Sequence, residues 1–161
     1  DPRGPEEDYY ILGGGPAPGL FSEHFLAQQD DLFKVPDHLT DAEAAALPLA
    51  GLTAWRAAFT KGQVREGQNV LITGIGGGVA LMALLFCVAA GANVYVNSSD
   101  DAKILKAIEL GARGGVNYKS DKWDSQLRNL THGEPFDVVI DGAGGEGFKA
   151  FTNLLRMGGI I

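Results

Sequence analysis

The chain has 161 residues, of which 45% are hydrophobic and 20% are charged, and its formal net charge at pH 7 is −7. This size and composition are typical of one soluble domain with part of a second. Nucleic acids and anionic membrane surfaces repel such a negative chain at long range, so we expect neither as a partner. A small anionic ligand must then be held by local groups.

The first part of the chain lacks the periodic pattern of a long helix. Residues 1–19 contain four prolines and five glycines, a composition that predicts loop structure. Two short apolar stretches follow, at Phe21–Leu26 and Leu32–Val35, and both are expected to be strand-like. At residue 40 the sequence changes to an Ala-rich pattern typical of a helix.

A helix is predicted to begin after residue 40. Thr40–Glu43 has the residues of a capping box, in which the first and last side chains bond each other's backbone N–H groups. The Ala-rich helix that follows is expected to end at Pro48, with a second helix over residues 49–60. We therefore divide the chain into domains at residues 1–40 and 41–161.

A glycine-rich turn is the most informative feature of the chain. Residues 70–80 read Val-Leu-Ile-Thr-Gly-Ile-Gly-Gly-Gly-Val-Ala, an apolar strand followed by glycines and the start of a helix. A dinucleotide pyrophosphate binds in this setting, because glycines admit it close to the backbone and a helix N-terminus offers unpaired N–H groups. A tight turn without a ligand is the alternative. The candidate cofactor-binding residues of the turn are Gly74, Gly76, Gly77, Gly78 and Val79.

Spacing within the turn supports the binding interpretation. Gly74, Gly77 and Ala80 are three residues apart. In such a series the first residue makes the turn, the second admits the phosphates, and the third lets helix and strand pack closely. We therefore expect the pyrophosphate to approach the backbone most closely at Gly77.

Apolar runs recur about every 22 residues, beginning near Val70, Val94, Val116, Val138 and Ile160. Helix-like segments separate them, and successive βα units require parallel strands with right-handed crossovers. Suitable helix ends are Gly91 and Gly111, and suitable helix starts are Ser99 or Asp100 and Ser120 or Asp121. The sequence predicts an α/β fold, a doubly wound parallel sheet of the Rossmann type.

The single cysteine, Cys87, lies in an uncharged stretch between Glu66 and Asp100. The glycines divide this stretch into a strand and a helix of about a dozen residues, too short to cross a bilayer. Cys87 cannot form an internal disulfide, which fits a reducing compartment, and we expect a cytoplasmic protein. The thiol itself is expected to be a small buried hydrophobe.

Several short strings occur in combination over nearly the whole chain: Gly19–His24, Val35-Pro36, Glu43–Pro48, Leu52–Trp55, Gly77–Ala80, Leu110–Ala112, Asn117-Tyr118, Asp137–Asp141 and Gly158-Gly159. In this combination the chain resembles the medium-chain dehydrogenase/reductase superfamily. Within it, the chain is similar to the zinc-independent quinone oxidoreductase branch, which includes fungal zinc-type alcohol dehydrogenase-like proteins.

The resemblance implies a second domain. Family members have an N-terminal substrate domain related to GroES, so residues 1–40 are expected to be its C-terminal remnant. Residues 41–161 are expected to be the Rossmann cofactor-binding domain, truncated in its fifth strand. The chain then looks like a fragment that is inactive alone, and its catalytic residues are unknown because the family's substrate-facing residues lie largely in the missing part.

The resemblance also bears on metal binding. Zinc-dependent members have a zinc-binding Cys two residues before the Gly of a Cys-Ala-Gly-x-Thr string, whereas this chain reads Leu49-Ala-Gly-Leu-Thr53. Leucine cannot ligate zinc. The histidines at 24, 38 and 132 are far apart in the sequence, and no Cys stands at metal-ligand spacing from any of them. We expect no metal site.

Cofactor choice depends on the end of the second predicted strand. Asn97-Ser98-Ser99 stands where an NAD enzyme offers an Asp or Glu to the ribose, and a neutral end leaves room for a 2′-phosphate. The resemblance implies that this phosphate is held by a small residue, a Lys four residues later and a Tyr fifteen further on. Ser99, Lys103 and Tyr118 match that spacing. We therefore expect NADPH.

Alternatives remain for these residues. Lys103 can lie on a solvated helix face, and Tyr118 can pack at a strand end. Asp100 and Asp101 would repel a phosphate if they turned inward, and we expect them at solvated N-terminal positions of a helix.

Two further positions are candidates on the nicotinamide side. The resemblance implies that Thr53 touches the nicotinamide or its ribose, although a threonine in a helix also bonds to its own turn. Asp141 can support the loop 142–145, with Ala143 beneath the nicotinamide, or it can cap the next helix. Trp55 and Trp123 are expected to pack within the fold.

The expected function is the cofactor-binding part of an NADPH-dependent oxidoreductase. It transfers hydride to a small-molecule substrate, either a quinone, an enone or another activated carbonyl compound, without catalytic zinc. A homodimer is the expected assembly. The alternatives are a trans-acting enoyl reductase of polyketide synthesis and a non-catalytic NADP(H)-binding sensor, because fold and cofactor site do not prove turnover. A methyltransferase is disfavoured, because Thr73 and Asn97 stand where it needs acidic residues.

Overall fold

The structure, a computed structural model, describes residues 19–161 and divides into two compact units between His38 and Leu39. The loop predicted for residues 1–19 lies almost entirely outside the described residues. Within residues 19–38 the regular structure is one 3₁₀ helix, η1 (Gln29–Asp31). The predicted strand-like stretches at 21–26 and 32–35 are wrong. Neither stretch pairs with another strand within residues 19–38, and an unpaired strand is not stable in water.

Helix α1 (Asp41–Trp55) opens the second unit and continues into a π-helical segment, η2 (Arg56–Lys61). The capping box is confirmed: the Glu43 N–H donates to Thr40 Oγ1 at 3.3 Å, and the Thr40 N–H donates to Glu43 Oε2 at 2.9 Å. The predicted break at Pro48 is wrong, since Pro48 lies inside α1. Pro48 is exposed, so water can reach the carbonyl that loses its helical donor there.

Five parallel strands form one sheet: β1 (Asn69–Ile72), β2 (Asn93–Ser98), β3 (Gly114–Asn117), β4 (Phe136–Ile140) and β5 (Leu155–Ile160). The strand order is β3-β2-β1-β4-β5, so the chain runs outward from β1 in both directions and the predicted doubly wound sheet is confirmed. The fifth strand begins at Leu155, earlier than the predicted start near Ile160. Its pairing with β4 is irregular, and exposed Met157 hides the apolar pattern of a strand.

The remaining helices are α2 (Gly78–Ala89), α3 (Asp101–Glu109), α4 (Trp123–Leu130), the 3₁₀ turn η3 (Gly145–Gly147) and α5 (Phe148–Leu154). Gly91 and Gly111 follow α2 and α3 with positive φ, as predicted for C-terminal caps. Asp100 caps α3 by accepting from the Ala102 N–H at 2.9 Å. No helix in residues 19–161 is long and apolar enough to span a bilayer.

The predicted start of α4 is wrong. Neither Ser120 nor Asp121 caps it, because Lys122 occupies the N-cap position in a left-handed conformation with φ +56°. The polar residues Ser120 and Asp121 therefore do not mark the start of α4.

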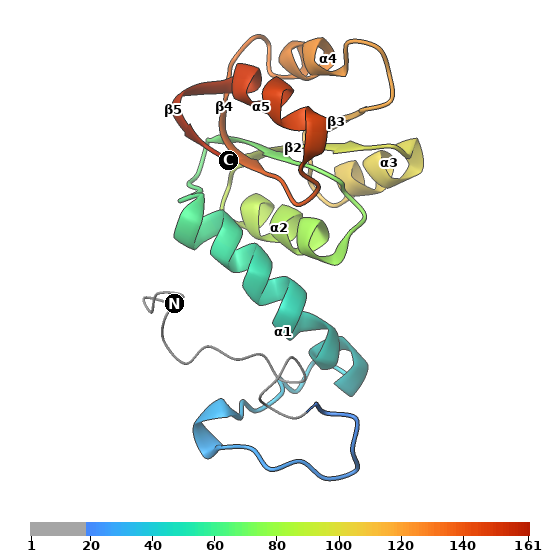
Figure 1. Ribbon diagram of the computed structural model, residues 1–161, viewed down its shortest axis with the longest axis vertical. Coiled ribbons are helices and arrows are strands. Elements are labelled where there is room, and N and C mark those ends of the chain that lie inside the picture. Colours follow the sequence, from blue (N-terminus) through green and yellow to red (C-terminus); the bar gives the residue numbers. More distant parts are fainter. Residues whose placement is uncertain (1–18) are drawn as a thin grey trace. The chain divides into compact units, whose positions relative to one another are not determined.

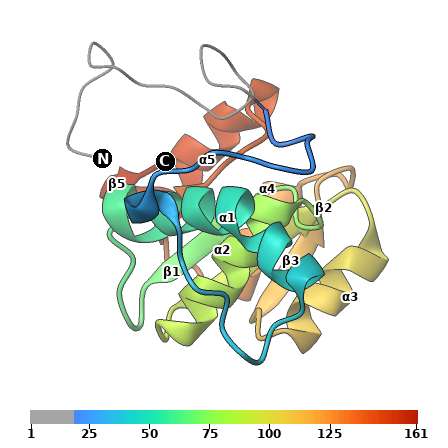
Figure 2. The same cartoon turned by 90° about the horizontal axis from the view of Figure 1, so that it is seen from below.

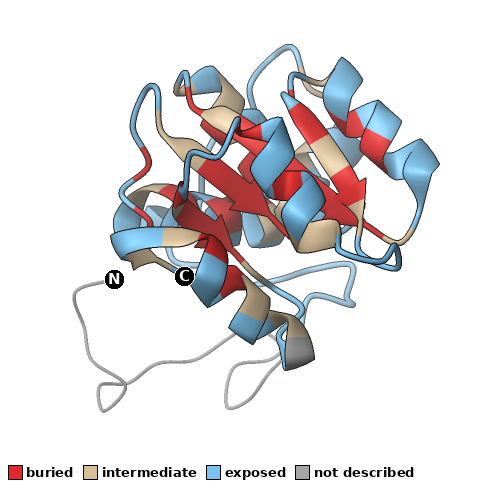
Figure 3. Cartoon of the chain, turned by 90° about the horizontal axis from the view of Figure 1, so that it is seen from above, coloured by how far each residue is buried: buried red, intermediate tan, exposed pale blue. Residues whose placement is uncertain are grey.

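Each face of the sheet has its own hydrophobic core. Alternate strand residues such as Val70 and Ile72 pack with α1, α2 and α3, and the intervening Leu71 packs with α4 and α5. Figure 1 shows these helices on opposite sides of the sheet, and α1 lies against α2 (Figure 2). The central strands are buried while the outer helix faces are exposed (Figure 3). The carboxyl edge of the strands is thus held between two packed layers.

Three sequence predictions about packing are confirmed. Cys87 is fully buried, and burial raises the pKa of its thiol to about 12, so it behaves as a small hydrophobe. The Trp55 ring lies 4.5 Å from that of Phe59, and the Trp123 ring lies 5.8 Å from that of Phe151. Both tryptophans therefore pack against aromatic neighbours, although Trp55 is still 52% exposed.

Two neighbouring glycines of β3 should respond differently to substitution. A Cβ at Gly115 would lie 2.7 Å from Ile104 Cγ2 and 2.9 Å from the Val96 carbonyl oxygen, whereas a Cβ at Gly114 would meet only the Leu130 side chain, at 3.3 Å. Gly115→Ala should lower the free energy of unfolding by about 2 kcal/mol, because backbone and helix cannot both move away. Gly114→Ala, the control, should change it by less than about 1 kcal/mol. Urea denaturation measures both, and equal losses would contradict this account.

Candidate functional site

The glycine turn lies directly after β1, at the carboxyl edge of the sheet, where open α/β folds bind ligands. Gly74 and Gly76 have φ of +62° and +119°, which a residue with a side chain rarely adopts. Gly77 is the N-cap of α2, with φ −81° and ψ 152°, and no side chain caps the helix. The first amides of α2, from Gly78 and Val79 onward, are thus available to an anion.

The turn is held from both neighbouring strands. On the β4 side, the Thr73 N–H donates to the Ile140 carbonyl at 3.0 Å. On the β2 side, the Ile75 N–H donates to the Asn97 carbonyl at 2.9 Å, and the Gly74 N–H donates to Asn97 Oδ1 at 2.9 Å. Asn97 is 3% exposed, so its amide oxygen serves the turn. Contact between Asn97 and a cofactor stays a prediction.

Lys103 lies across the turn. A Cβ built on Gly76 would be 2.7 Å from Lys103 Cδ and 3.4 Å from Lys103 Nζ, so the lysine stem passes directly over this glycine. Glycine is favoured at this position by its φ of +119°, and the flexible lysine stem rests against it. The structure therefore brings the predicted phosphate-binding lysine onto the predicted phosphate-binding turn.

The other residues of the predicted 2′-phosphate site gather at the same edge. The Tyr118 N–H donates to the Ser98 carbonyl at 3.0 Å, which places Tyr118 beside the end of β2 with a half-exposed ring. Ser99 is half-buried between β2 and α3. Ser98 is buried, and its hydroxyl oxygen accepts from the Asp100 N–H at 3.2 Å. The Ser98 hydroxyl is therefore already engaged in a hydrogen bond within the protein.

The two acidic residues at the start of α3 are both engaged. Asp100 accepts from the Ala102 N–H, and Asp101 accepts from Asn117 Nδ2 at 2.9 Å. These bonds hold the carboxylates at the helix start, where the macrodipole favours negative charge.

The loop after β4 is organised by Asp141. Its Oδ1 accepts from the Ala143 N–H at 3.2 Å, and its Oδ2 accepts from the Gly144 N–H at 3.1 Å. The alternative role as a helix cap is wrong, since no side chain caps η3 or α5. The Thr73 hydroxyl also donates to Asp141 Oδ1, at 2.5 Å. This contact of Thr73 was not predicted, although the sequence places a hydroxyl directly before the glycine turn and an Asp directly after a strand.

Helix α1 approaches the start of α2. A Cβ at Gly78 would lie 3.5 Å from Ala50 Cβ, so the two helices are close at this point. Thr53, one turn further along α1, is exposed. Within the described residues its hydroxyl makes no hydrogen bond to its own turn, and its predicted contact with the nicotinamide stays a prediction.

The described residues do not supply a zinc site. No group of three His, Cys, Asp or Glu side chains in residues 19–161 is placed to hold a metal ion. Leu49, at the position where zinc-dependent relatives were expected to have a Cys, is 79% exposed and has no donor atom. Cys87, the single thiol of the chain, lies in the core.

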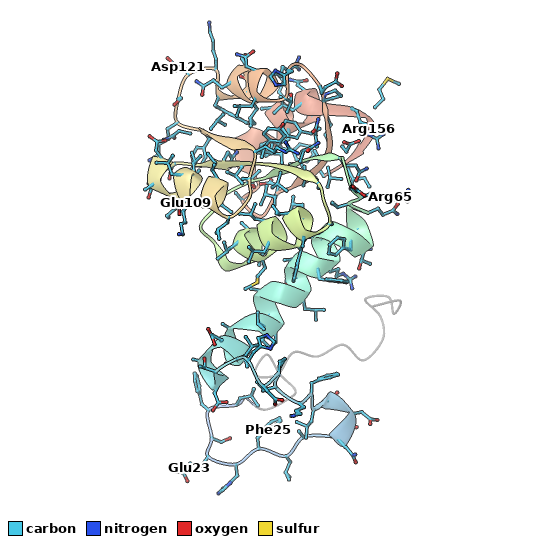
Figure 4. All side chains as sticks on the ribbon, turned by 180° about the vertical axis from the view of Figure 1, so that it is seen from behind. Glu23, Phe25, Arg65, Glu109, Asp121 and Arg156 are labelled. Carbon is cyan, nitrogen blue, oxygen red and sulfur yellow. The ribbon has the colours of Figure 1, made fainter. Side chains whose placement is uncertain are left out.

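A cavity of about 660 Å³ lies at the opposite, amino edge of the strands. Its central carboxylate is already paired: Asp137 accepts from the Asn69 N–H at 2.9 Å and from Arg156 Nε at 2.6 Å. Arg156 also lines a smaller hollow with Arg65, and Figure 4 shows both arginines on the same side of the unit. This edge carries none of the candidate cofactor residues, so the candidate site is the carboxyl edge of the sheet.

Comparison with known proteins identifies a family model and two related proteins. A family model described as zinc-binding dehydrogenase matches residues 78–161, just over half of the chain. The zinc-type alcohol dehydrogenase-like protein YogA of Leptosphaeria maculans is 48% identical over 172 residues, covering 100% of this chain and 48% of the relative. The crotonyl-CoA reductase of Streptomyces collinus is 33% identical over 162 residues, covering 89% of this chain and 36% of the relative.

A solved structure described as an NAD-dependent alcohol dehydrogenase matches with a TM-score of 0.90 and 34% identity, covering 96% of this chain and 45% of that one. The chain thus spans about half the length of the relatives it matches, or less. The matched family consists of oxidoreductases that bind a nicotinamide cofactor. The chain belongs to this zinc-binding dehydrogenase family, within the medium-chain dehydrogenase/reductase superfamily.

Proposed function

We propose that the chain is the cofactor-binding part of an NADPH-dependent oxidoreductase that reduces a quinone, an enone or another activated carbonyl compound without catalytic zinc. One observation carries the proposal: Lys103 lies across Gly76, directly beside the uncapped N-terminus of α2. A cation and a set of free amides converge on one glycine turn, which suits a ligand with several phosphates.

The residues would divide the cofactor between them. The amides of Gly78 and Val79 would bind the pyrophosphate, and Lys103 would hold the 2′-phosphate with Ser99 and Tyr118. Thr53 and Ala143 would face the nicotinamide half. When bound, the cofactor supplies the hydride, and the protein's part is to orient the ring and exclude competing reactions.

Charge favours NADPH over NADH at this site. The end of β2 carries no carboxylate for a ribose 2′-hydroxyl, since Asn97 bonds the turn and Ser98 is neutral. Asp100 and Asp101 are each held by a donor from the protein. One structural neighbour is described as NAD-dependent, so we expect the choice of cofactor to depend on these side chains and not on the fold.

Similarity to a crotonyl-CoA reductase favours an enoyl reductase as the second candidate. A conjugated enone and an enoyl thioester accept hydride in the same way, and both need the same cofactor site. A cytoplasmic location and a homodimer remain predictions, as does the division at residue 40 into a GroES-like remnant and a cofactor domain.

Lys103→Met keeps the aliphatic stem over Gly76 and removes the charge. NADPH affinity should fall about ten- to a hundredfold, because a charge-assisted contact is lost, while NADH affinity should stay within about twofold. Lys106→Met is the matched control: its ammonium lies on the same helix and pairs with Glu109 at 2.8 Å. Calorimetric titration with both cofactors measures the preference. An unchanged preference in Lys103→Met would remove the lysine from the phosphate site.

Gly77→Ser separates ligand binding from folding. Gly77 has a backbone conformation that serine accepts, and the nearest atom to an added Cβ is the Gly74 carbonyl oxygen, at 3.8 Å. The new hydroxyl would cap α2 and so occupy the amides that a phosphate needs. We expect an equal or higher melting temperature together with at least about tenfold weaker NADPH binding. A lower melting temperature with unchanged affinity would show that the turn itself requires glycine.

Zinc should be absent from the reaction. Leu49 has no donor atom, and residues 19–161 hold no metal-binding cluster. Elemental analysis of the purified full-length protein should find far less than one zinc ion per chain, and chelation should leave its reductase activity unchanged. Stoichiometric zinc whose removal abolishes reduction would overturn this part of the proposal.

A further inference from the structure

One carboxylate connects the two loops of the candidate site. Asp141 accepts three hydrogen bonds: from the Thr73 hydroxyl at 2.5 Å, from the Ala143 N–H at 3.2 Å and from the Gly144 N–H at 3.1 Å. Thr73 directly precedes Gly74, the first glycine of the turn after β1. The other two donors belong to the loop after β4. Asp141 therefore touches both loops, which arise from adjacent strands.

The shortest of these bonds is also the most protected. Thr73 is 5% exposed, and its 2.5 Å contact with a carboxylate has the length of a strong charge-assisted bond. The Thr73 backbone is fixed separately, by its N–H bond to the Ile140 carbonyl at 3.0 Å. The hydroxyl makes a contact separate from this backbone bond, and that contact is with the Asp141 side chain.

The loop after β4 depends on Asp141 for its shape. Gly144 and Gly145 have φ of +63° and +81°, so the loop turns through conformations that favour glycine. No side chain caps η3 or α5, which follow it. The carboxylate supplies the side-chain contacts that hold the Ala143 and Gly144 amides toward the carboxyl edge of the sheet.

Resting on the proposed function, we propose that Thr73 and Asp141 are positioning residues that couple the pyrophosphate turn to the nicotinamide loop. Thr73 orients the carboxylate, and the carboxylate orients the loop that carries Ala143. Neither residue needs to touch the cofactor. The adenosine half of the site, formed by the turn and α3, is held independently by Asn97 through the Gly74 N–H.

The test compares two ligands on a set of variants. NADPH spans both loops, whereas adenosine 2′,5′-bisphosphate carries the adenosine half without a nicotinamide. Thr73→Val removes the hydroxyl and keeps the shape, Asp141→Ala removes the carboxylate, and the double variant removes both. Thr73→Ser restores the hydroxyl. Thr131→Val is the matched control: Thr131 is 4% exposed, and its hydroxyl donates to the Glu134 carbonyl at 2.6 Å, at the opposite edge of the sheet.

We expect Thr73→Val and Asp141→Ala each to weaken NADPH binding about tenfold and to change bisphosphate binding less than about threefold. The double variant should match Asp141→Ala, because the two residues act through one bond. Thr73→Ser should bind NADPH within about twofold of the parent protein. Thr131→Val should lower the melting temperature without changing either affinity.

Three outcomes would overturn the coupling: unchanged NADPH affinity in both single variants, parallel loss of both ligands, or fully additive losses in the double variant. A parent protein that binds neither NADPH nor the bisphosphate would instead overturn the proposed function, and the coupling with it. The two failures are therefore distinguishable in the same titrations.

Discussion

The uncapped N-terminus of α2 behind its glycine turn is the feature on which the rest of the site depends. A chain with net charge −7 repels an anion at long range, but solvent ions screen that repulsion beyond about 10 Å. At shorter distances, local hydrogen-bond donors determine whether an anion is bound. A helix terminus contributes about 0.3 to 1 kcal/mol, and a charge-assisted hydrogen bond about 1.5 to 3 kcal/mol. Free amides can therefore hold a phosphate, and under the proposed function a cation such as Lys103 would determine which phosphate is preferred.

The sheet fixes the position of that turn. β1 lies between β2 and β4, and each neighbour supplies one main-chain acceptor to the residues after β1. Asn97 and Asp141 then add one side-chain acceptor from each side. A glycine-rich segment has a large conformational entropy to lose, so bonds from two flanking strands stabilise a single conformation of the turn. The cores on both faces keep these strand ends in register.

Wrong predictions share a physical cause, which is that local propensity yielded to packing or pairing. Pro48 did not end α1, because the helix continues into residues that pack against α2 and the proline faces solvent. The fifth strand begins earlier in the chain than predicted, because an exposed edge strand shows little apolar alternation. The start of α4 was misplaced, because Lys122 adopts a left-handed conformation that no sequence pattern announced.

The sequence by itself determined the order of elements, the parallel sheet and the position of the glycine turn. Each of these follows from local periodicity and from backbone freedom at glycine, and both can be read along the chain. Tertiary structure alone decided which side chains meet across the strand ends. Residues 73 and 141 are 68 positions apart, and no local pattern pairs their side chains. Likewise, Lys103 reaches Gly76 only because α3 packs beside the turn. Such contacts depend on how strands and helices assemble, and that assembly brings the other candidate residues to the glycine turn.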